Sequence, residues 1–363
     1  ASRLIHDPRR ILDAQAKLWA AHLKLWQNAG RRLMGEDYEE VAPAPKGDKR
    51  FKDAAWTEHT LFDFIKQSYL LTANWLQETV EGVDGLDDKE RKKIAFYTKQ
   101  FVDAISPSNF VLTNPEVLKE TLRTNGENLV RGVTHIIEDL ERGHGRLAIR
   151  QVDETKFKVG ENLATTPGKV VYQNDLMQLL QFSPTTDEVY ERPLLIIPPW
   201  INKFYILDLK PENSFIRWAV AQGYTLFVVS WVNPDAHLSR KTFDDYLTEG
   251  FYEAVDAVCK AADTDALNVI GYCIGGTVTA AGLAHMAAKK DTRVKAATFF
   301  TSQVDFTEAG DLSVFIDDEQ LAHIEAQMKA QGGYLDGGAM ATTFNMLRSN
   351  DLIWSFVVNN YLM

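Results

Sequence analysis

One short segment carries the residue types that nucleophilic catalysis needs. Residues 267–277 read Leu-Asn-Val-Ile-Gly-Tyr-Cys-Ile-Gly-Gly-Thr, a β-branched strand that runs into a G-x-C-x-G-G turn. So tight a turn leaves room only for hydrogen at its flanking positions, which Gly271 and Gly275 supply, while Gly276 lets the following helix pack closely. Cys273 is then expected at a helix N-terminus, where the dipole and free N–H groups favour a thiolate. We therefore predict that Cys273 is a catalytic nucleophile; the alternative is a buried structural cysteine.

The order of the predicted elements places this turn in an α/β sheet. The expected strands are 157–159, 170–172, 177–182, 194–197, 225–231, 268–271 and 296–301. The expected helices among the later strands are 214–222, 246–262 and 277–290. Strands that alternate with helices form a mostly parallel sheet with helices on both faces. With a nucleophile on a strand–turn–helix elbow, this arrangement resembles the α/β-hydrolase fold, with cysteine in place of the usual serine.

The first 150 residues show helical periodicity and almost no strand signal. In the first helix a heptad row recurs beside a second apolar row, and together they give one wide apolar stripe, with basic residues along another face. The heptad row is Leu12, Trp19, Trp26 and Leu33, and the row beside it is Ile11, Leu18 and Leu25. We interpret the stripe as packing on neighbouring helices; the alternative is a docking surface for a hydrophobic particle or partner. Further helices are expected at 60–81, 87–105 and 114–140.

These patterns divide the chain into three expected segments. They are a helical N-terminal domain (1–150), an α/β-hydrolase core (151–305) and the start of a cap (306–363). An insertion after the sixth strand of such a sheet usually covers the active site. The chain begins without methionine and ends in an apolar, aromatic run, so we expect it to be part of a longer chain.

Composition limits the classes of function. The net charge of −11 argues against nucleic acid as the main partner. Two cysteines in 363 residues do not make a disulfide framework; Cys259 is expected in the core, and this cysteine usage fits a reducing cytoplasm. The sequence contains no run of 18 apolar residues, so no membrane-spanning helix is predicted. The first ten residues do not resemble a signal peptide.

Several motifs resemble the polyhydroxyalkanoate synthases along essentially the whole chain. They include Arg50-Phe51-Lys52-Asp53, residues 67–71, 107–115, 198–209 and 230–234, and the elbow at 271–276. The large helical region, together with Tyr272 and Ile274 beside the nucleophile, is similar to the class I synthases, single polypeptides with short-chain substrates.

The resemblance implies a function. It implies polymerisation of (R)-3-hydroxyacyl-CoA, typically 3-hydroxybutyryl-CoA, into polyhydroxyalkanoate, with release of CoA through an acyl-cysteine thioester on Cys273. No metal or separate cofactor is expected, because coenzyme A belongs to the substrate and is a product. The expected partner is a cytoplasmic polyester granule, and the expected assembly is a homodimer. The alternatives are a cysteine-dependent thioesterase or polyester hydrolase and a non-catalytic granule-surface protein.

Acyl transfer also needs an oxyanion hole. The hydrolase template places one donor at the N–H of Ile274 and the other in the loop after strand 194–197. That loop reads Pro-Pro-Trp-Ile-Asn, and prolines have no N–H, so Ile201 or Asn202 is the expected donor. A rigid Pro-Pro turn with a packed tryptophan is the structural alternative, and it is compatible with this role.

The remaining catalytic groups are not identified. In the family the catalytic Asp and His lie beyond the cap, and no position of this chain matches them. Family pattern argues against Asp305 as the acid, although it follows the strand after the elbow. His237 follows a strand on the expected active-site side, and we interpret it as a surface or supporting histidine. We interpret His323 as an ordinary helix residue of the cap, so this chain alone is expected to accept at most one acyl group.

Overall fold

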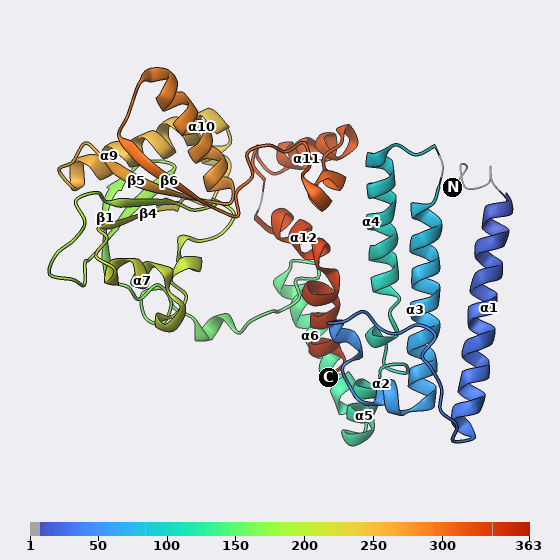
Figure 1. The fold of residues 1–363 in the computed structure, drawn as a ribbon. Coiled ribbons are helices and arrows are strands. Elements are labelled where there is room, and N and C mark those ends of the chain that lie inside the picture. Colours follow the sequence, from blue (N-terminus) through green and yellow to red (C-terminus); the bar gives the residue numbers. More distant parts are fainter. Residues whose placement is uncertain (1–7, 84, 336) are drawn as a thin grey trace. The chain divides into compact units, whose positions relative to one another are not determined.

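The computed structural model describes residues 8–83, 85–335 and 337–363, which form two compact units (Figure 1). The first unit runs to Val152 and adds Asp311–Phe315 and Thr342–Met363. The second unit comprises Asp153–Gly310 and Ile316–Ala341. These boundaries differ from the expected division at residues 150 and 305, because the C-terminal residues group with the N-terminal helices. The assignment of 306–363 to a cap stays a prediction.

The second unit is built on a mixed sheet with the strand order β1-β2-β4-β3-β5-β6. Its strands are β1 (Gly168–Gln173), β2 (Met177–Phe182), β3 (Leu194–Ile197), β4 (Leu226–Trp231), β5 (Leu267–Tyr272) and β6 (Val294–Phe300). The β1–β2 and β2–β4 pairs are antiparallel, and the β4–β3, β3–β5 and β5–β6 pairs are parallel. An antiparallel edge followed by a parallel sheet with crossed-over strand order is the α/β-hydrolase arrangement predicted from the sequence.

Helices cover both faces of this sheet. Figure 1 shows α9 (Glu253–Ala261) and α10 (Ile274–Lys289) on one face and α7 (Phe215–Ala221) on the other. Side chains of a strand alternate between faces, so Leu195 packs with the α9 and α10 core while its neighbour Ile196 packs with the α7 core. Both side chains are fully buried. The helix α8 (Phe243–Asp245) and a π-helix, η8 (Tyr246–Tyr252), precede α9, and α11 (Asp318–Ala330) follows β6.

The first unit is helical. Its helices are α1 (Pro8–Leu33), α2 (Ala55–Glu58), α3 (Thr60–Glu81), α4 (Asp88–Ala104), α5 (Pro115–Arg123), α6 (Glu127–Arg142) and α13 (Ser355–Tyr361). The helix α12 (Gly337–Leu347) leads into this unit and is followed by a π-helix, η10 (Asn350–Trp354). Among the helices that the structure describes, none combines the length and apolar character that a bilayer crossing requires.

Two predicted elements are wrong. The strand expected at 157–159 is absent from this described segment, where only an isolated bridge joins Val159 to Leu163. The single helix expected at 114–140 is two helices, α5 and α6, because Asn125 and Gly126 adopt φ angles of 51° and 86°. Two successive residues with positive φ cannot continue a right-handed helix.

The outer surface of α1 also differs from expectation. This helix packs on α3 through a face that includes Leu25 and Asn28, both buried. Within the stripe expected to pack on neighbouring helices, Leu25 is buried, whereas Leu12, Trp19, Trp26 and Leu33 are 64–77% exposed. The packing interpretation therefore holds for the side of the stripe that includes Leu25 and is wrong for the exposed heptad row, although the ring centroids of Trp26 and Phe64 lie 4.6 Å apart.

Candidate active site

Cys273 joins β5 to α10 in a backbone conformation that most residues avoid. Its φ and ψ angles are 56° and −125°, and holding a non-glycine residue in such a region costs about 1–3 kcal/mol. Hydrogen bonds hold the peptide on each side of it. The Cys273 N–H donates to the carbonyl of Phe300 on β6 at 2.9 Å, and the Cys273 carbonyl accepts from the Gly276 N–H at 2.9 Å. The structure thus holds the thiol-bearing residue in a strained turn at the helix N-terminus.

Three glycines make this turn sterically feasible. A Cβ atom on Gly271 would lie 2.5 Å from the Cα of Gly276. A Cβ on Gly275 would lie 2.1 Å from the carbonyl oxygen of Ile197, at the end of β3. A Cβ on Gly276 would lie 1.9 Å from the hydroxyl of Ser302. The first two contacts involve backbone atoms that cannot move aside easily, so only hydrogen fits there.

Three hydroxyl groups donate hydrogen bonds to backbone carbonyls around the elbow, and none of them was predicted from the sequence. Ser302 Oγ donates to the carbonyl of Gly271 at 3.1 Å, and Thr279 Oγ1 donates to that of Gly275 at 2.7 Å. Thr277 Oγ1 donates to the carbonyl of Gln303 at 2.7 Å. Ser302 follows the strand next to β5, and this position was the sequence signal that could have identified it.

The predicted oxyanion donors lie on two segments that meet at the elbow. Ile274 is the first residue of α10, and within the described residues its N–H has no hydrogen-bond acceptor, as expected for the first turn of a helix. Close packing of Gly275 against Ile197 and Pro198 brings the loop after β3 to the same place. Ile201 and Asn202 lie exposed on that loop. Their roles as donors stay predictions.

The structure places the other acid–base candidates on exposed segments. His237 is exposed on a turn whose backbone is capped by Asp235, and His323 is exposed on α11. Asp305 is exposed, and its carboxylate accepts from the Thr307 hydroxyl and N–H at 2.6 and 2.9 Å, which lowers its pKa. In the part of the chain that the structure describes, no side-chain hydrogen bond joins Cys273 to any of these three candidates.

The second cysteine has a different environment. Cys259 lies on α9, half-buried against the hydrophobic core of the sheet, as expected from the sequence. Burial raises the pKa of its thiol, although the nearby Arg293 guanidinium opposes this change. A raised pKa leaves less of the nucleophilic thiolate at neutral pH.

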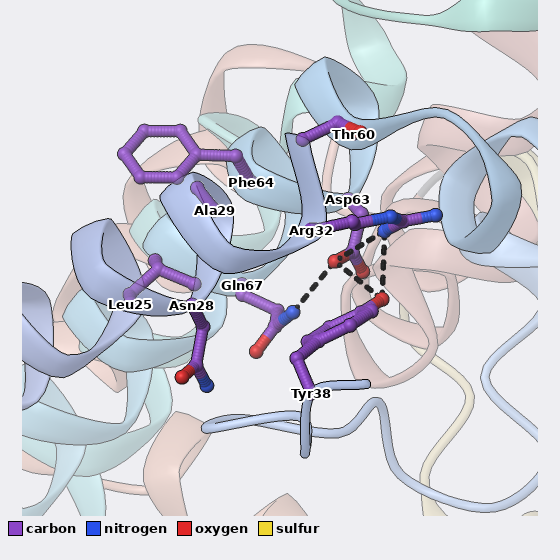
Figure 2. A pocket seen from close by; sticks show the side chains of 9 residues that line it. All are labelled: Leu25, Asn28, Ala29, Arg32, Tyr38, Thr60, Asp63, Phe64 and Gln67. Carbon is purple, nitrogen blue, oxygen red and sulfur yellow. Dashed lines mark hydrogen bonds and ion pairs between the residues drawn. The ribbon is translucent and has the colours of Figure 1, made fainter. Parts of the chain in front are cut away.

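A small cavity in the helical unit is structural. It has a volume of about 10 Å³, which is room for about one water molecule. Figure 2 shows Arg32 from α1 and Gln67 from α3 directed at the Asp63 carboxylate, which they reach at 3.0 and 2.8 Å. Tyr38 donates to the same carboxylate at 3.0 Å. All three groups donate to Asp63 Oδ2, while Asp63 Oδ1 forms an ion pair with Lys66 Nζ at 3.0 Å. This polar cluster ties α1 to α3.

The strand order and the strained cysteine elbow define an α/β-hydrolase-fold protein with a cysteine at the turn between β5 and α10. Residues 47–219 match the family model described as "Poly-beta-hydroxybutyrate polymerase (PhaC) N-terminus". The chain is 50% identical to the poly(3-hydroxyalkanoate) polymerase subunit PhaC of Rhizobium meliloti over 99% of its length. It is 51% identical to the poly(3-hydroxyalkanoate) polymerase of Methylorubrum extorquens over 100% of its length, and 41% identical to the PhaC subunit of Cupriavidus necator over 98%.

These matches confirm the resemblance predicted from the sequence: the chain is a relative of the poly(3-hydroxyalkanoate) polymerases. It spans 58–60% of the length of the three relatives. Among solved structures it matches a putative hydrolase from Agrobacterium vitis S4, with 17% identity over 47% of this chain and 62% of that one and a TM-score of 0.30.

Proposed function

We propose that this chain is the nucleophile-bearing part of a poly(3-hydroxyalkanoate) polymerase, in which Cys273 accepts the acyl group of an (R)-3-hydroxyacyl-CoA. The backbone of Cys273 carries the proposal. A strained, glycine-flanked cysteine at the N-terminus of α10 is the arrangement that a nucleophile elbow requires. Similarity to proteins named as polymerases gives the polymer class, and the resemblance to class I synthases points to 3-hydroxybutyryl-CoA as substrate.

The proposed chemistry exchanges one thioester for another. The Cys273 thiolate attacks the acyl-CoA carbonyl carbon, the new C–S bond forms, and the bond to the CoA sulfur breaks as CoA leaves as a thiolate. This step is close to thermoneutral, so the acyl group stays activated. A hydroxyl of the growing chain, deprotonated by a general base, then attacks the acyl-cysteine. An ester bond forms and the Cys273 thiolate is released, whereas serine would hold the acyl group in a less reactive oxygen ester.

The exposed stripe of α1 supports the proposed contact with a polyester granule. Trp19 and Trp26 are 71% and 64% exposed, with Lys17 and Lys24 exposed nearby on the same helix. Aromatic side chains beside basic ones are typical of helices that lie on apolar surfaces. A homodimer at the granule remains a proposal that rests on the resemblance alone.

The competing function is hydrolysis of thioesters or polyesters by the same cysteine. Incubating the polypeptide with 3-hydroxybutyryl-CoA while measuring CoA, free 3-hydroxybutyrate and polymer together separates the two functions. We expect CoA release without matching free acid, and its loss in Cys273→Ser but not in Cys259→Ser. Free acid equal to the CoA released would assign a hydrolase, and CoA release that survives Cys273→Ser would remove the nucleophile assignment.

A further inference from the structure

The loop after β3 is anchored by a tryptophan from the neighbouring strand. Trp231 ends β4 and is 8% exposed. Its indole Nε1 donates a buried hydrogen bond of 2.7 Å to the carbonyl oxygen of Pro198. Pro198 is the first residue after β3 and has no N–H of its own. Hydrogen bonds to the backbone of Pro198 can therefore form only at its carbonyl oxygen.

The same carbonyl lies against the elbow. A Cβ atom on Gly275 would lie 2.7 Å from the Pro198 oxygen and 2.1 Å from that of Ile197. Gly275 is two residues after Cys273, in the first turn of α10. The Pro198 carbonyl thus contacts both the Trp231 indole and the helix turn that bears the nucleophile. Any shift of Trp231 releases one side of this contact.

Aromatic packing fixes the loop a second time. The Trp200 ring lies 4.5 Å from the ring of Tyr246 and 5.8 Å from that of Trp231, between ring centroids. Tyr246 belongs to the π-helix η8, and such helices are frequent at functional sites. Gly250 of the same π-helix has no side chain where a Cβ would lie 2.6 Å from the Trp231 ring. A hydrogen bond at Pro198 and aromatic packing at Trp200 therefore restrain the loop immediately before Ile201.

We propose that Trp231 is a positioning residue for acyl transfer. By fixing the Pro198 carbonyl, its indole N–H directs the backbone N–H groups of Ile201 or Asn202 toward the oxyanion that forms on the substrate. Such donors act over about 2.7–3.1 Å, so a small displacement of the loop weakens them. This inference rests on the proposed function, because it assumes that Cys273 attacks an acyl carbon.

Two reactions of Cys273 separate positioning from simple structural damage. Attack on a thioester passes through a tetrahedral oxyanion. Attack on iodoacetamide forms a C–S bond as the C–I bond breaks and iodide leaves, without an oxyanion. A change that misplaces only the oxyanion donors therefore slows acylation and spares alkylation. A change that distorts the elbow slows both reactions.

The test compares Trp231→Phe with Trp218→Phe, a control that makes the same change at a tryptophan 53% exposed on α7. Rates of acylation by 3-hydroxybutyryl-CoA and of alkylation by iodoacetamide are measured on the Cys273 peptide by mass mapping, after reaction at about pH 9, where ordinary thiols are largely ionised. We expect Trp231→Phe to slow acylation roughly 10–100-fold, somewhat less than outright removal of an oxyanion donor. Its alkylation rate should stay within about twofold of wild type, and the control should change neither rate.

Gly250→Ala gives an independent second variant, because its Cβ would lie 2.6 Å from the Trp231 ring and displace it. It should show the same split between the two rates, and it decides the question if Trp231→Phe fails to fold. Unchanged acylation in the folded variants, or a parallel fall of both rates, would overturn the positioning role. Wild-type protein that alkylates but never acylates at Cys273 would instead refute the proposed function, and this inference with it.

Discussion

Removing the Cβ atom of residue 273 should stabilise the sheet unit. Cys273 adopts φ 56° and ψ −125°, a conformation open to glycine but strained for any residue with a side chain. Cys273→Gly and Cys273→Ala both lack the thiol and differ only in that Cβ atom. Their difference in unfolding free energy therefore isolates the strain stored at the elbow.

The expected magnitude follows from two opposing effects. Relief of backbone strain should favour Cys273→Gly by about 1–3 kcal/mol. The greater freedom of glycine in the unfolded chain opposes this by about 0.4–1 kcal/mol. Cys273→Gly should therefore be more stable than Cys273→Ala by about 1.3 kcal/mol at the midpoints of the two ranges, and by at most about 2.6 kcal/mol. Ala284→Gly is a matched control, since it deletes an exposed Cβ from the same helix, α10, and should destabilise by about 1 kcal/mol.

Native-state hydrogen exchange measures the stability changes at positions 273 and 284 within the sheet unit itself. Amides of β5 and α10 report the opening of the sheet unit, whether or not the helical unit unfolds with it. The prediction is an inversion of sign: the same atom deletion stabilises at position 273 and destabilises at position 284. A Cys273→Gly protein that exchanges at the rate of Cys273→Ala, or faster, would refute the strain argument.

Two further predictions concern titratable groups. At about pH 7 iodoacetamide should modify Cys273 before Cys259, because burial raises the pKa of the Cys259 thiol; peptide mapping that finds Cys259 modified first would contradict this. In the helical unit, burial opposes ionisation of Asp139, but hydrogen bonds from the Tyr361 hydroxyl and the Arg150 N–H outweigh it and lower its pKa. The ionised Asp139 carboxylate therefore stabilises the fold fully above about pH 4, and this stabilisation is lost as the pH falls through its lower folded pKa. Amides of α13, which carries Tyr361, should accordingly lose exchange protection on acidification in wild type. They should lose less protection in Asp139→Asn.

The sheet and the elbow were largely predictable from the sequence. Buried strands are short apolar runs between turn residues, and the strands at 177–182 and 194–197 were predicted with their observed bounds. The glycine spacing around Cys273 encodes the turn because only hydrogen fits there. The break between α5 and α6 was missed although Asn125-Gly126 is a common turn sequence.

Other features depend on contacts that no local pattern records. The heptad spacing of Trp19 and Trp26 shows that they share a face, but not that α1 packs on α3 through the adjacent Leu25 and leaves these two tryptophans exposed. The hydrogen bond from Trp231 to Pro198 joins residues 33 positions apart. The two residues meet because β4 lies next to β3 in the sheet, which no local sequence pattern records.

Mass mapping of the acylated protein tests the central claim most directly. The polypeptide is mixed with 3-hydroxybutyryl-CoA, quenched in acid to preserve thioesters, digested and analysed by mass spectrometry. We predict a hydroxybutyryl adduct on the peptide that carries Cys273, removed by neutral hydroxylamine and missing from Cys273→Ser. An adduct on Cys259, or acylation that persists in Cys273→Ser, would contradict the assignment of Cys273 as the nucleophile.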